Sequence, residues 1–249
     1  MLSLLRTPRW ISFTALLIFF IIAFGLLSRW QWSRAEEHRL ERIAIEERAN
    51  AAPEPISELL PPTTQLPTDL EWRQVSVSGT FTSQSALVRK RPLGGQNGFW
   101  AMSAFQLSDG TFVWINRGWT AATGDALGTP TVTPPPSGPV AIIARLRPSQ
   151  FAPNPQPADL PAGQVTDADV SILPAVAGPE YDVYLELVSS TPDAHNGLIL
   201  LSPPEIDDNQ NISYAVQWLL FAGVGLVGWF FFLRREARTE ASAEADQRN

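Results

Sequence analysis

The sequence contains no cysteine and only two histidines among its 249 residues. Without cysteine there can be no disulfide, no thiolate metal site and no cysteine nucleophile. His38 and His195 lie far apart along the chain, so we expect no histidine-rich metal site. Phosphate loops, dinucleotide fingerprints and the G-x-S-x-G elbow are also missing. These absences predict that the protein is not an enzyme; the alternative is a dispersed active site that includes Asp193 and His195.

Basic residues are scarce in the middle of the chain. Residues 53–208 contain sixteen Asp or Glu but only seven Lys or Arg, a net charge of minus nine. Binding to nucleic acid requires a basic surface, so this function is excluded for the region. The same region holds 21 of the 22 prolines, which disfavours a helix-rich fold.

Charge is absent from two stretches, Trp10 to Ser28 and Asn209 to Leu233. About 20 apolar residues in a helix span the hydrocarbon core of a bilayer, so both stretches are predicted to be transmembrane helices in contact with lipid. Arg234, Arg235 and Arg238 follow the second stretch, and positive residues stay on the cytoplasmic side. Two spans then place both termini in the cytoplasm. We therefore expect a two-span protein of a bacterial-type plasma membrane, with its central domain outside the cytoplasm.

A cleaved signal peptide is the alternative for the first stretch. Ala23-Phe24-Gly25 offers a small-x-small cleavage site. The apolar run continues past this site and Arg29 follows closely, which favours an uncleaved span. Because further arginines follow Arg29 up to residue 48, the predicted orientation depends on the second span rather than the first.

The chain therefore divides into seven predicted parts. Helix formers and oppositely charged residues three or four apart predict that the first helix continues as a charged helix beyond the span. The predicted bounds are 1–9 for a cytoplasmic N-terminus, 10–28 for the first transmembrane helix, 29–52 for the juxtamembrane helix, 53–68 for a proline-rich connector, 69–210 for an extracytoplasmic β-rich domain, 211–233 for the second transmembrane helix and 234–249 for a cytoplasmic tail.

Alternating apolar residues predict short strands in the β-rich domain. The clearest pair is 99–107 with 111–119, a hairpin around Asp109-Gly110, because this dipeptide tolerates the positive φ of tight turns. Further predicted strands are 75–81, 85–91, 140–146, 182–188 and 197–201, with helical turns within 167–173. The predicted fold class is an α+β membrane protein, with two transmembrane helices flanking a mainly antiparallel β domain that forms a curled sheet or small barrel.

Tryptophan is unusually frequent, with nine residues. Five lie near the ends of the two spans, where an indole ring suits the membrane interface. Trp72, Trp100, Trp114 and Trp119 belong to the β-rich domain. Either packing in the core or an aromatic docking surface explains these four.

Polar residues occupy the outer turns of the second span, where lipid makes them costly. Tyr214, Gln217 and Trp218 share one helix face because they are three or four residues apart. We expect this face to pair with Gln31 and Arg34 of the first helix, or to hold a cofactor.

Five short motifs follow one another along nearly the whole chain. They are Trp30-Gln31 with Arg34; Arg73-x-Val75 followed by Gly79-Thr80-Phe81; Arg91 and Gly98 before the hairpin; Asn116-Arg117-Gly118-Trp119; and Tyr214-Ala215-x-Gln217-Trp218. In this order, and flanked by two spans, they resemble the surfeit-locus family of cytochrome c oxidase assembly factors. The fourth motif is similar to that family's [ND]-R-G-W signature and the fifth to its Y-A-x-Q-W entry into the second span.

The resemblance implies a non-enzymatic chaperone of respiratory-chain biogenesis, which helps a haem-copper cytochrome c oxidase to mature through contacts with the catalytic subunit. A haem a carrier between haem a synthase and the oxidase is the alternative, and an unrelated envelope scaffold or enzyme is another. The family usually has a haem-linked histidine before the second span, where this chain has Asn211. An asparagine amide is a poor axial ligand for haem iron, so we expect no haem a bound through this residue. His38 and His195 are the remaining imidazoles.

Overall fold

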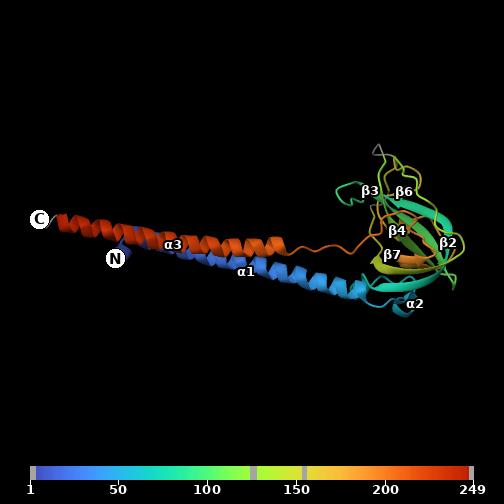
Figure 1. The fold of residues 1–249 in the computed structure, drawn as a ribbon, viewed down its shortest axis with the longest axis horizontal. Helices are drawn as coiled ribbons and strands as arrows, with labels where there is room; N and C mark the ends of the chain where they lie inside the picture. Colours follow the sequence, from blue (N-terminus) through green and yellow to red (C-terminus); the bar gives the residue numbers. More distant parts are fainter. Residues whose placement is uncertain (1–3, 124–127, 153–155, 247–249) are drawn as a thin grey trace. The chain divides into compact units, whose positions relative to one another are not determined.

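A computed structural model describes residues 4–123, 128–152 and 156–246 of the chain. These residues form two units (Figure 1), which we treat separately. The helical unit consists of the two terminal parts of the chain, the residues up to Ile43 and the residues from Glu205 onward. The β unit contains Ala44–Pro204.

Two long helices dominate the helical unit. Helix α1 runs from Pro8 to Asn50 without interruption, so the charged segment does continue the apolar one, and α3 runs from Asn209 to Asp246. Both helices are long and apolar enough to cross a membrane. Their apolar side chains are largely exposed, as at Phe19 (62%) and Val227 (71%), which distinguishes them from the buried core helices of a soluble protein.

The two helices are antiparallel neighbours. Three hydrogen-bonding contacts link them in opposite chain order: Trp229 Nε1 to Thr14 Oγ1 at 3.1 Å, Ser28 Oγ to the Ala215 carbonyl at 2.9 Å, and Asn211 Nδ2 to His38 Nδ1 at 3.4 Å. The α1 partners Thr14, Ser28 and His38 belong to a row of less exposed residues spaced three and four apart, the seam of a left-handed helix pair. Small residues on this seam let the backbones approach closely.

Five strands close into a barrel in the β unit. Their order is β2-β3-β4-β7-β5, and β5 pairs again with β2. The bounds are Gln74–Val88 for β2, Gly98–Leu107 for β3, Phe112–Ala121 for β4, Pro139–Pro148 for β5 and Glu180–Thr191 for β7. The short strands β1 (Glu54–Pro55) and β6 (Gln164–Val165) each pair with β2 in parallel. The smaller helical elements are η1 (Leu4–Arg6), α2 (Ile56–Leu59), η2 (Thr68–Leu70) and η3 (Val170–Ile172).

The predicted hairpin is confirmed. Strands β3 and β4 pair antiparallel from Gly98 opposite Ala121 to Gln106 opposite Phe112. Gly110 in the turn has a φ of 89°, the positive value that favours glycine at this position.

Other strand predictions differ from the structure. The predicted strands 75–81 and 85–91 are one continuous strand, β2, with a register shift between Phe81 and Ser85. Residues 197–201 form no strand and contribute only one bridge, from Ile199 to Trp119. Strand β7 pairs with β4 in parallel, which joins segments that are far apart in the sequence.

The proline-rich connector contributes to the barrel core. Strand β1 extends the edge of β2, and α2 carries Ile56 into the core, followed by Leu60. Both side chains are almost fully buried. The connector therefore packs against the barrel, although its composition gave no sign of order.

Alternate residues of β4 face two different clusters. Val113 and Ile115 belong to the interior core of the barrel, while Trp114 packs on the outer side with Met102 and Tyr184. The outer cluster is covered by the segment around β6 and η3. Trp114, Trp119 and Trp72 are all buried, so these tryptophans pack in the structure rather than form an exposed docking surface.

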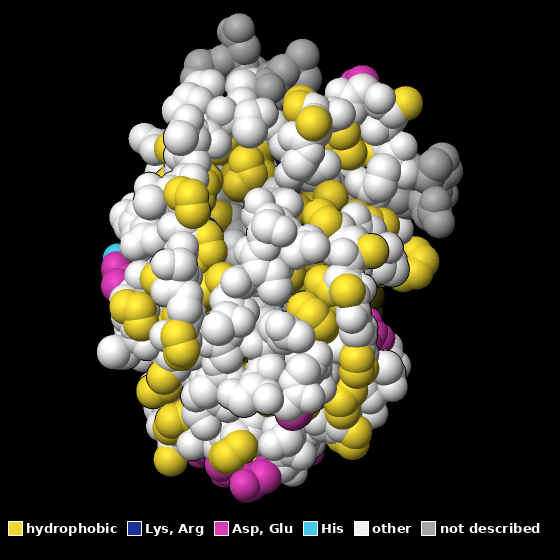
Figure 2. All heavy atoms as spheres, turned by 90° about the vertical axis from the view of Figure 1, so that its right-hand side faces the viewer, with side chains coloured by type: hydrophobic (Ala, Val, Ile, Leu, Met, Phe, Trp, Pro, Cys, Tyr) yellow, Lys and Arg dark blue, Asp and Glu magenta, His cyan; other side chains and the backbone are white. Residues whose placement is uncertain are grey.

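The acidic balance of the β unit is visible on its surface. Figure 2 shows one face with acidic side chains near the edges, scattered hydrophobic side chains and no described Lys or Arg in view. This face has no basic area that could attract a polyanion.

Gly79 provides a test of the barrel. A Cβ atom at this position would lie 1.9 Å from the backbone oxygen of Gln106, so Gly79→Ala must displace backbone. We expect it to lower the free energy of unfolding of the β unit by about 2–3 kcal/mol, in the range for overpacking. The matched change Ser78→Ala, at an exposed neighbour, should stay within about 0.5 kcal/mol. Denaturation of the full chain in detergent, followed by circular dichroism, measures both; equal effects would contradict the close packing.

Candidate functional site

The motif residues of the β unit come together around Trp119. The indole Nε1 of Trp119 donates to the carbonyl of Arg91 at 2.5 Å. Gly98 lies directly against this ring: a Cβ at Gly98 would be 2.3 Å from ring atom Cε2 of Trp119. The backbone N–H of Arg91 in turn donates to the carbonyl of Gly98 at 3.0 Å. Three residues from two motifs thus form one interlocked group.

The side chain of Arg91 extends this group toward the outer cluster. Its guanidinium lies 4.4 Å from the ring centroid of Trp100 and donates to Asp167 at 3.2 Å and to Gln150 at 2.8 Å. The arginine therefore ties the end of β2 to the segment that covers the outer cluster. Gly79, another motif glycine, lies where β2 comes close to the backbone of Gln106.

Asn116 and Gly118 shape the backbone of the fourth motif. Asn116 Oδ1 accepts from the N–H of Gly118 at 3.1 Å, and Gly118 has a φ of 139°. A Cβ at Gly118 would lie 2.7 Å from the carbonyl oxygen of Ile199, so glycine allows that segment to pair with Trp119. The predicted strand 111–119 thus runs through this glycine, and β4 continues to Ala121.

Arg117 lies on the opposite face of β4 from the group formed by Arg91, Gly98 and Trp119. It follows Val113 and Ile115 along the inner side of β4 and is 2% exposed. Nε donates to the carbonyl of Ala194 at 2.7 Å and one Nη to the carbonyl of Thr133 at 2.8 Å. Burial lowers the pKa of Arg117 to about 10, which still leaves the group charged at neutral pH.

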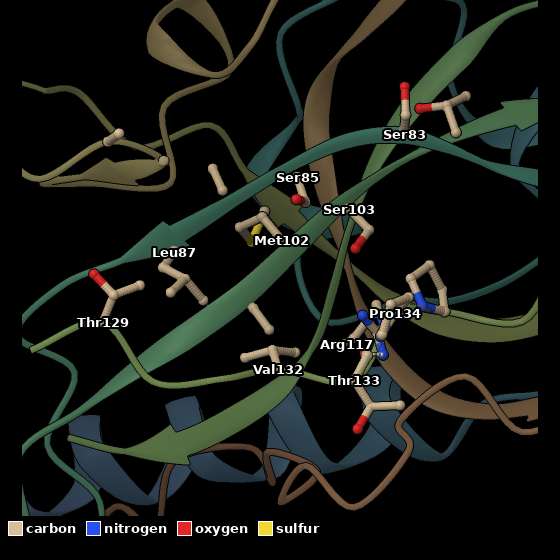
Figure 3. Close-up of a pocket in the computed structure, with 16 residues that line it drawn as sticks. Ser83, Ser85, Leu87, Met102, Ser103, Arg117, Thr129, Val132, Thr133 and Pro134 are labelled. Carbon is tan, nitrogen blue, oxygen red and sulfur yellow. Dashed lines mark hydrogen bonds between the residues drawn. The ribbon is translucent and has the colours of Figure 1, made fainter. Parts of the chain in front are cut away.

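A cavity of about 390 Å³ opens beside Arg117 (Figure 3). Strands β2, β3 and β4 form its wall, and Ser85, Ser103 and Arg117 are among the side chains that line it. The segment from Thr129 to Pro135 contributes the remaining side. The cavity size is within the usual range for small-molecule sites.

The motif residues of the helical unit differ in their surroundings. Arg34 pairs with Glu37 at 3.1 Å on its own helix. The small residues Ser28 and Ala215 make a hydrogen bond between the two helices. Gln31 belongs to the less exposed row of α1, whereas Tyr214 and Gln217 are exposed on α3. The expected pairing of Gln31 and Arg34 with this face of the second helix stays a prediction.

Trp218 contacts the other helix through its aromatic ring. Its ring stacks on Phe24 with centroids 5.5 Å apart and an interplanar angle of 23°. Its Nε1 is buried without a hydrogen-bond partner among the described residues. Trp30, by contrast, is 60% exposed, as expected for an interfacial tryptophan.

Asn211, the residue expected at the position of the haem-linked histidine, lies beside His38. The amide nitrogen of Asn211 is 3.4 Å from His38 Nδ1. If the amide instead turns its oxygen to Nδ1–H, the lone pair of Nε2 remains available to a metal. If a haem were held here, the imidazole of His38 would be the side chain to supply a nitrogen to its iron, whereas the amide of Asn211 would be a poor ligand. The described residues contain no group of three His, Cys, Asp or Glu that could hold a metal ion.

The segment suggested as a dispersed active site gives little support to catalysis. His195 Nδ1 contacts the carboxylate of Asp193, and both side chains are substantially exposed. Asp193 also accepts the backbone N–H of His195 at 3.0 Å, the arrangement of a local turn.

Comparison with known proteins places these motifs in a family. The sequence profile of the SURF1 family matches residues 18–223. An uncharacterized SURF1-like protein of Mycobacterium tuberculosis (strain ATCC 25618 / H37Rv) is 26% identical over 249 residues, which cover 98% of this chain and 90% of the relative. A SURF1-like protein of Dictyostelium discoideum is 30% identical over 117 residues, 45% of this chain and 43% of the relative.

The absence of native cysteine permits a direct test of the helix pair. We expect Ser28→Cys with Ala215→Cys to form an intramolecular disulfide on mild oxidation, because these residues meet on the seam. The matched pair Ser33→Cys with Val216→Cys, at exposed positions of the same helices, should remain largely unlinked. Protease cleavage in the β unit followed by non-reducing electrophoresis distinguishes the linked from the unlinked chain. Equal linkage of both pairs would argue against the seam.

Proposed function

Because the chain belongs to the SURF1 family, we propose that it is a membrane-anchored assembly factor for a haem-copper cytochrome c oxidase. In this role it acts through protein contacts with the catalytic subunit rather than through catalysis. The observation that carries the proposal is the convergence of Arg91, Gly98 and Trp119 on one interlocked group, together with the family match over residues 18–223. Arg91, Gly98 and Trp119 thus fix the packing of this part of the β unit, and with it the surface that the unit offers to a partner.

We propose the two long helices as the membrane anchor and the β unit as the part that reaches the oxidase outside the cytoplasm. Arg234, Arg235 and Arg238 at the end of the second apolar stretch support a cytoplasmic C-terminus in a plasma membrane. The acidic surface of the β unit supports contact with a protein rather than with anionic lipid or nucleic acid.

Gene deletion and complementation test the assembly role. We expect deletion to lower the haem a absorbance and the oxidase activity of isolated membranes, and the full chain to restore both. A matched variant, in which a flexible linker replaces residues 53–204, keeps the two spans and should restore neither, because it lacks the β unit. Immunoblots must show that both proteins reach the membrane. Unchanged absorbance and activity after deletion would contradict the proposal.

A haem a carrier that also contacts haem a synthase is the second candidate function. His38 favours it, because this imidazole lies beside Asn211, at the position where the family usually has its haem-linked histidine. In this role His38 supplies one axial nitrogen, and Asn211 fixes the orientation of its ring.

The two histidines provide a matched test of this second function. When the full chain is purified from cells that make haem a, we expect a Soret band that is lost in His38→Ala and retained in His195→Ala. The second change removes the other imidazole, which lies in the β unit. A preparation without haem absorbance, or a band that persists in His38→Ala, would exclude His38 as the ligand and leave the assembly role untouched.

A further inference from the structure

Arg117 is buried, and it differs in its partners from the partly buried arginines of the β unit. A carboxylate lies within 4 Å of four of them, in the pairs Arg73–Glu54, Arg91–Asp167, Arg145–Glu186 and Arg147–Glu71. Among the described residues, no carboxylate lies within this distance of the Arg117 guanidinium. The acceptors of its two hydrogen bonds are carbonyl oxygens, which orient the group but do not neutralise its charge.

The acidic group that acts on Arg117, Asp193, already has another partner. Asp193 contributes a favourable charge interaction to Arg117, but its carboxylate contacts His195 and is 54% exposed. Water screens such an interaction strongly. Within the part of the chain that the structure describes, Arg117 is thus a buried cation without a counter-ion of its own, an arrangement that is costly unless a charge of opposite sign is supplied.

The cavity beside Arg117 has the composition of an anion site. Its lining contains one cation and no Asp or Glu. Six hydroxyl-bearing residues also line it: Thr82, Ser83, Ser85, Ser103, Thr129 and Thr133. A guanidinium has five N–H donors. Hydrogen bonds within the part of the chain that the structure describes use two of those of Arg117.

The size and charge of the cavity restrict the class of anion that it can bind. One guanidinium balances one negative charge, so a monoanion fits better than a phosphate dianion, which would leave a buried excess charge. Leu87, Met102 and Val132 give the cavity apolar wall as well, and its volume of about 390 Å³ exceeds that of a bare inorganic ion. We propose that this cavity binds a carboxylate carried on a small apolar body, through Arg117 at its base. The ligand is either a free organic acid or the C-terminal carboxylate of a peptide.

The two hydrogen bonds from Arg117 to carbonyl oxygens contribute to the geometry of the site. They hold the guanidinium from the sides of Ala194 and Thr133, so its orientation is fixed before a ligand arrives. Ser103 lies on the adjacent strand β3 and is almost fully buried, and Figure 3 shows its hydroxyl in the same cavity as Arg117. A hydroxyl and a charged donor from neighbouring strands can then share one carboxylate.

A matched pair of ligands tests the proposal. N-acetylleucine and N-acetylleucinamide differ only in whether the carboxylate is present, and both are soluble in detergent solution. In calorimetric titrations of the full-length protein, we expect the acid to bind at least about tenfold more tightly than the amide, the value of one hydrogen-bonded charge pair. Hexanoate in parallel distinguishes a simple organic acid from a peptide terminus. Equal binding of the acid and the amide, or no binding of either acid, overturns the proposal.

Two variants separate binding from a purely structural role of Arg117. Arg117→Gln removes the charge and should abolish the preference for the acid, whereas Arg145→Gln alters an arginine outside the cavity and should retain it. Because Arg117→Gln also removes bracing bonds, a second variant leaves the arginine intact. Ser85 is exposed in the cavity, so Ser85→Phe can fill the space without displacing the core, and should abolish binding at an unchanged melting temperature. Retained acid binding in Ser85→Phe or Arg117→Gln would refute the site.

Discussion

The closure of the barrel through β2 is the constraint on which the rest of the β unit depends. This strand pairs with β5 along its first half and with β3 along most of its length, and Gly79 and Thr80 pair on both sides. A strand that is hydrogen-bonded at both edges has little freedom to move, and the absent side chain of Gly79 lets the backbone of Gln106 come close. Closure also separates an inner face from an outer one. The inner face carries Arg117, and the outer face carries the outer cluster around Trp114.

The sequence predicted those elements whose signal is local. The hairpin around Gly110 and the two apolar helices follow from turn chemistry and from the length of the apolar stretches, and both are present. The parallel pairing of β4 with β7 could not be predicted in the same way. It joins segments separated by about sixty residues, and no local pattern specifies which strands become neighbours. The order of the connector was missed for a similar reason, since Ile56 gains its burial from distant strands.

The candidate sites show the same division. The motif residues Asn116 to Trp119 could be recognised from the sequence, but their separate tasks could not. Trp119 meets Gly98 and Arg91, whereas Arg117 continues the inner row of Val113 and Ile115. Strict alternation would place Arg117 and Trp119 on the same face, because they are two positions apart. The register shift between β3 and β4, where Trp100 lies opposite Trp119 but Met102 lies opposite Asn116, interrupts that alternation. The partners Ala194 and Thr133 lie in irregular segments that carry no periodic signal.

The position of Arg117 also shows why net charge is a poor guide to what a particular site binds. Residues 53–208 carry a net charge of minus nine, which by itself disfavours an anionic ligand. Surface charges are screened over about 8–10 Å in physiological salt, whereas a buried guanidinium acts through a medium of much lower dielectric constant. The local cation therefore dominates within the cavity, while the acidic surface disfavours ligands with several negative charges. A ligand with a single carboxylate and an apolar body satisfies both conditions, because it meets the buried charge and brings no further anionic groups to the acidic rim.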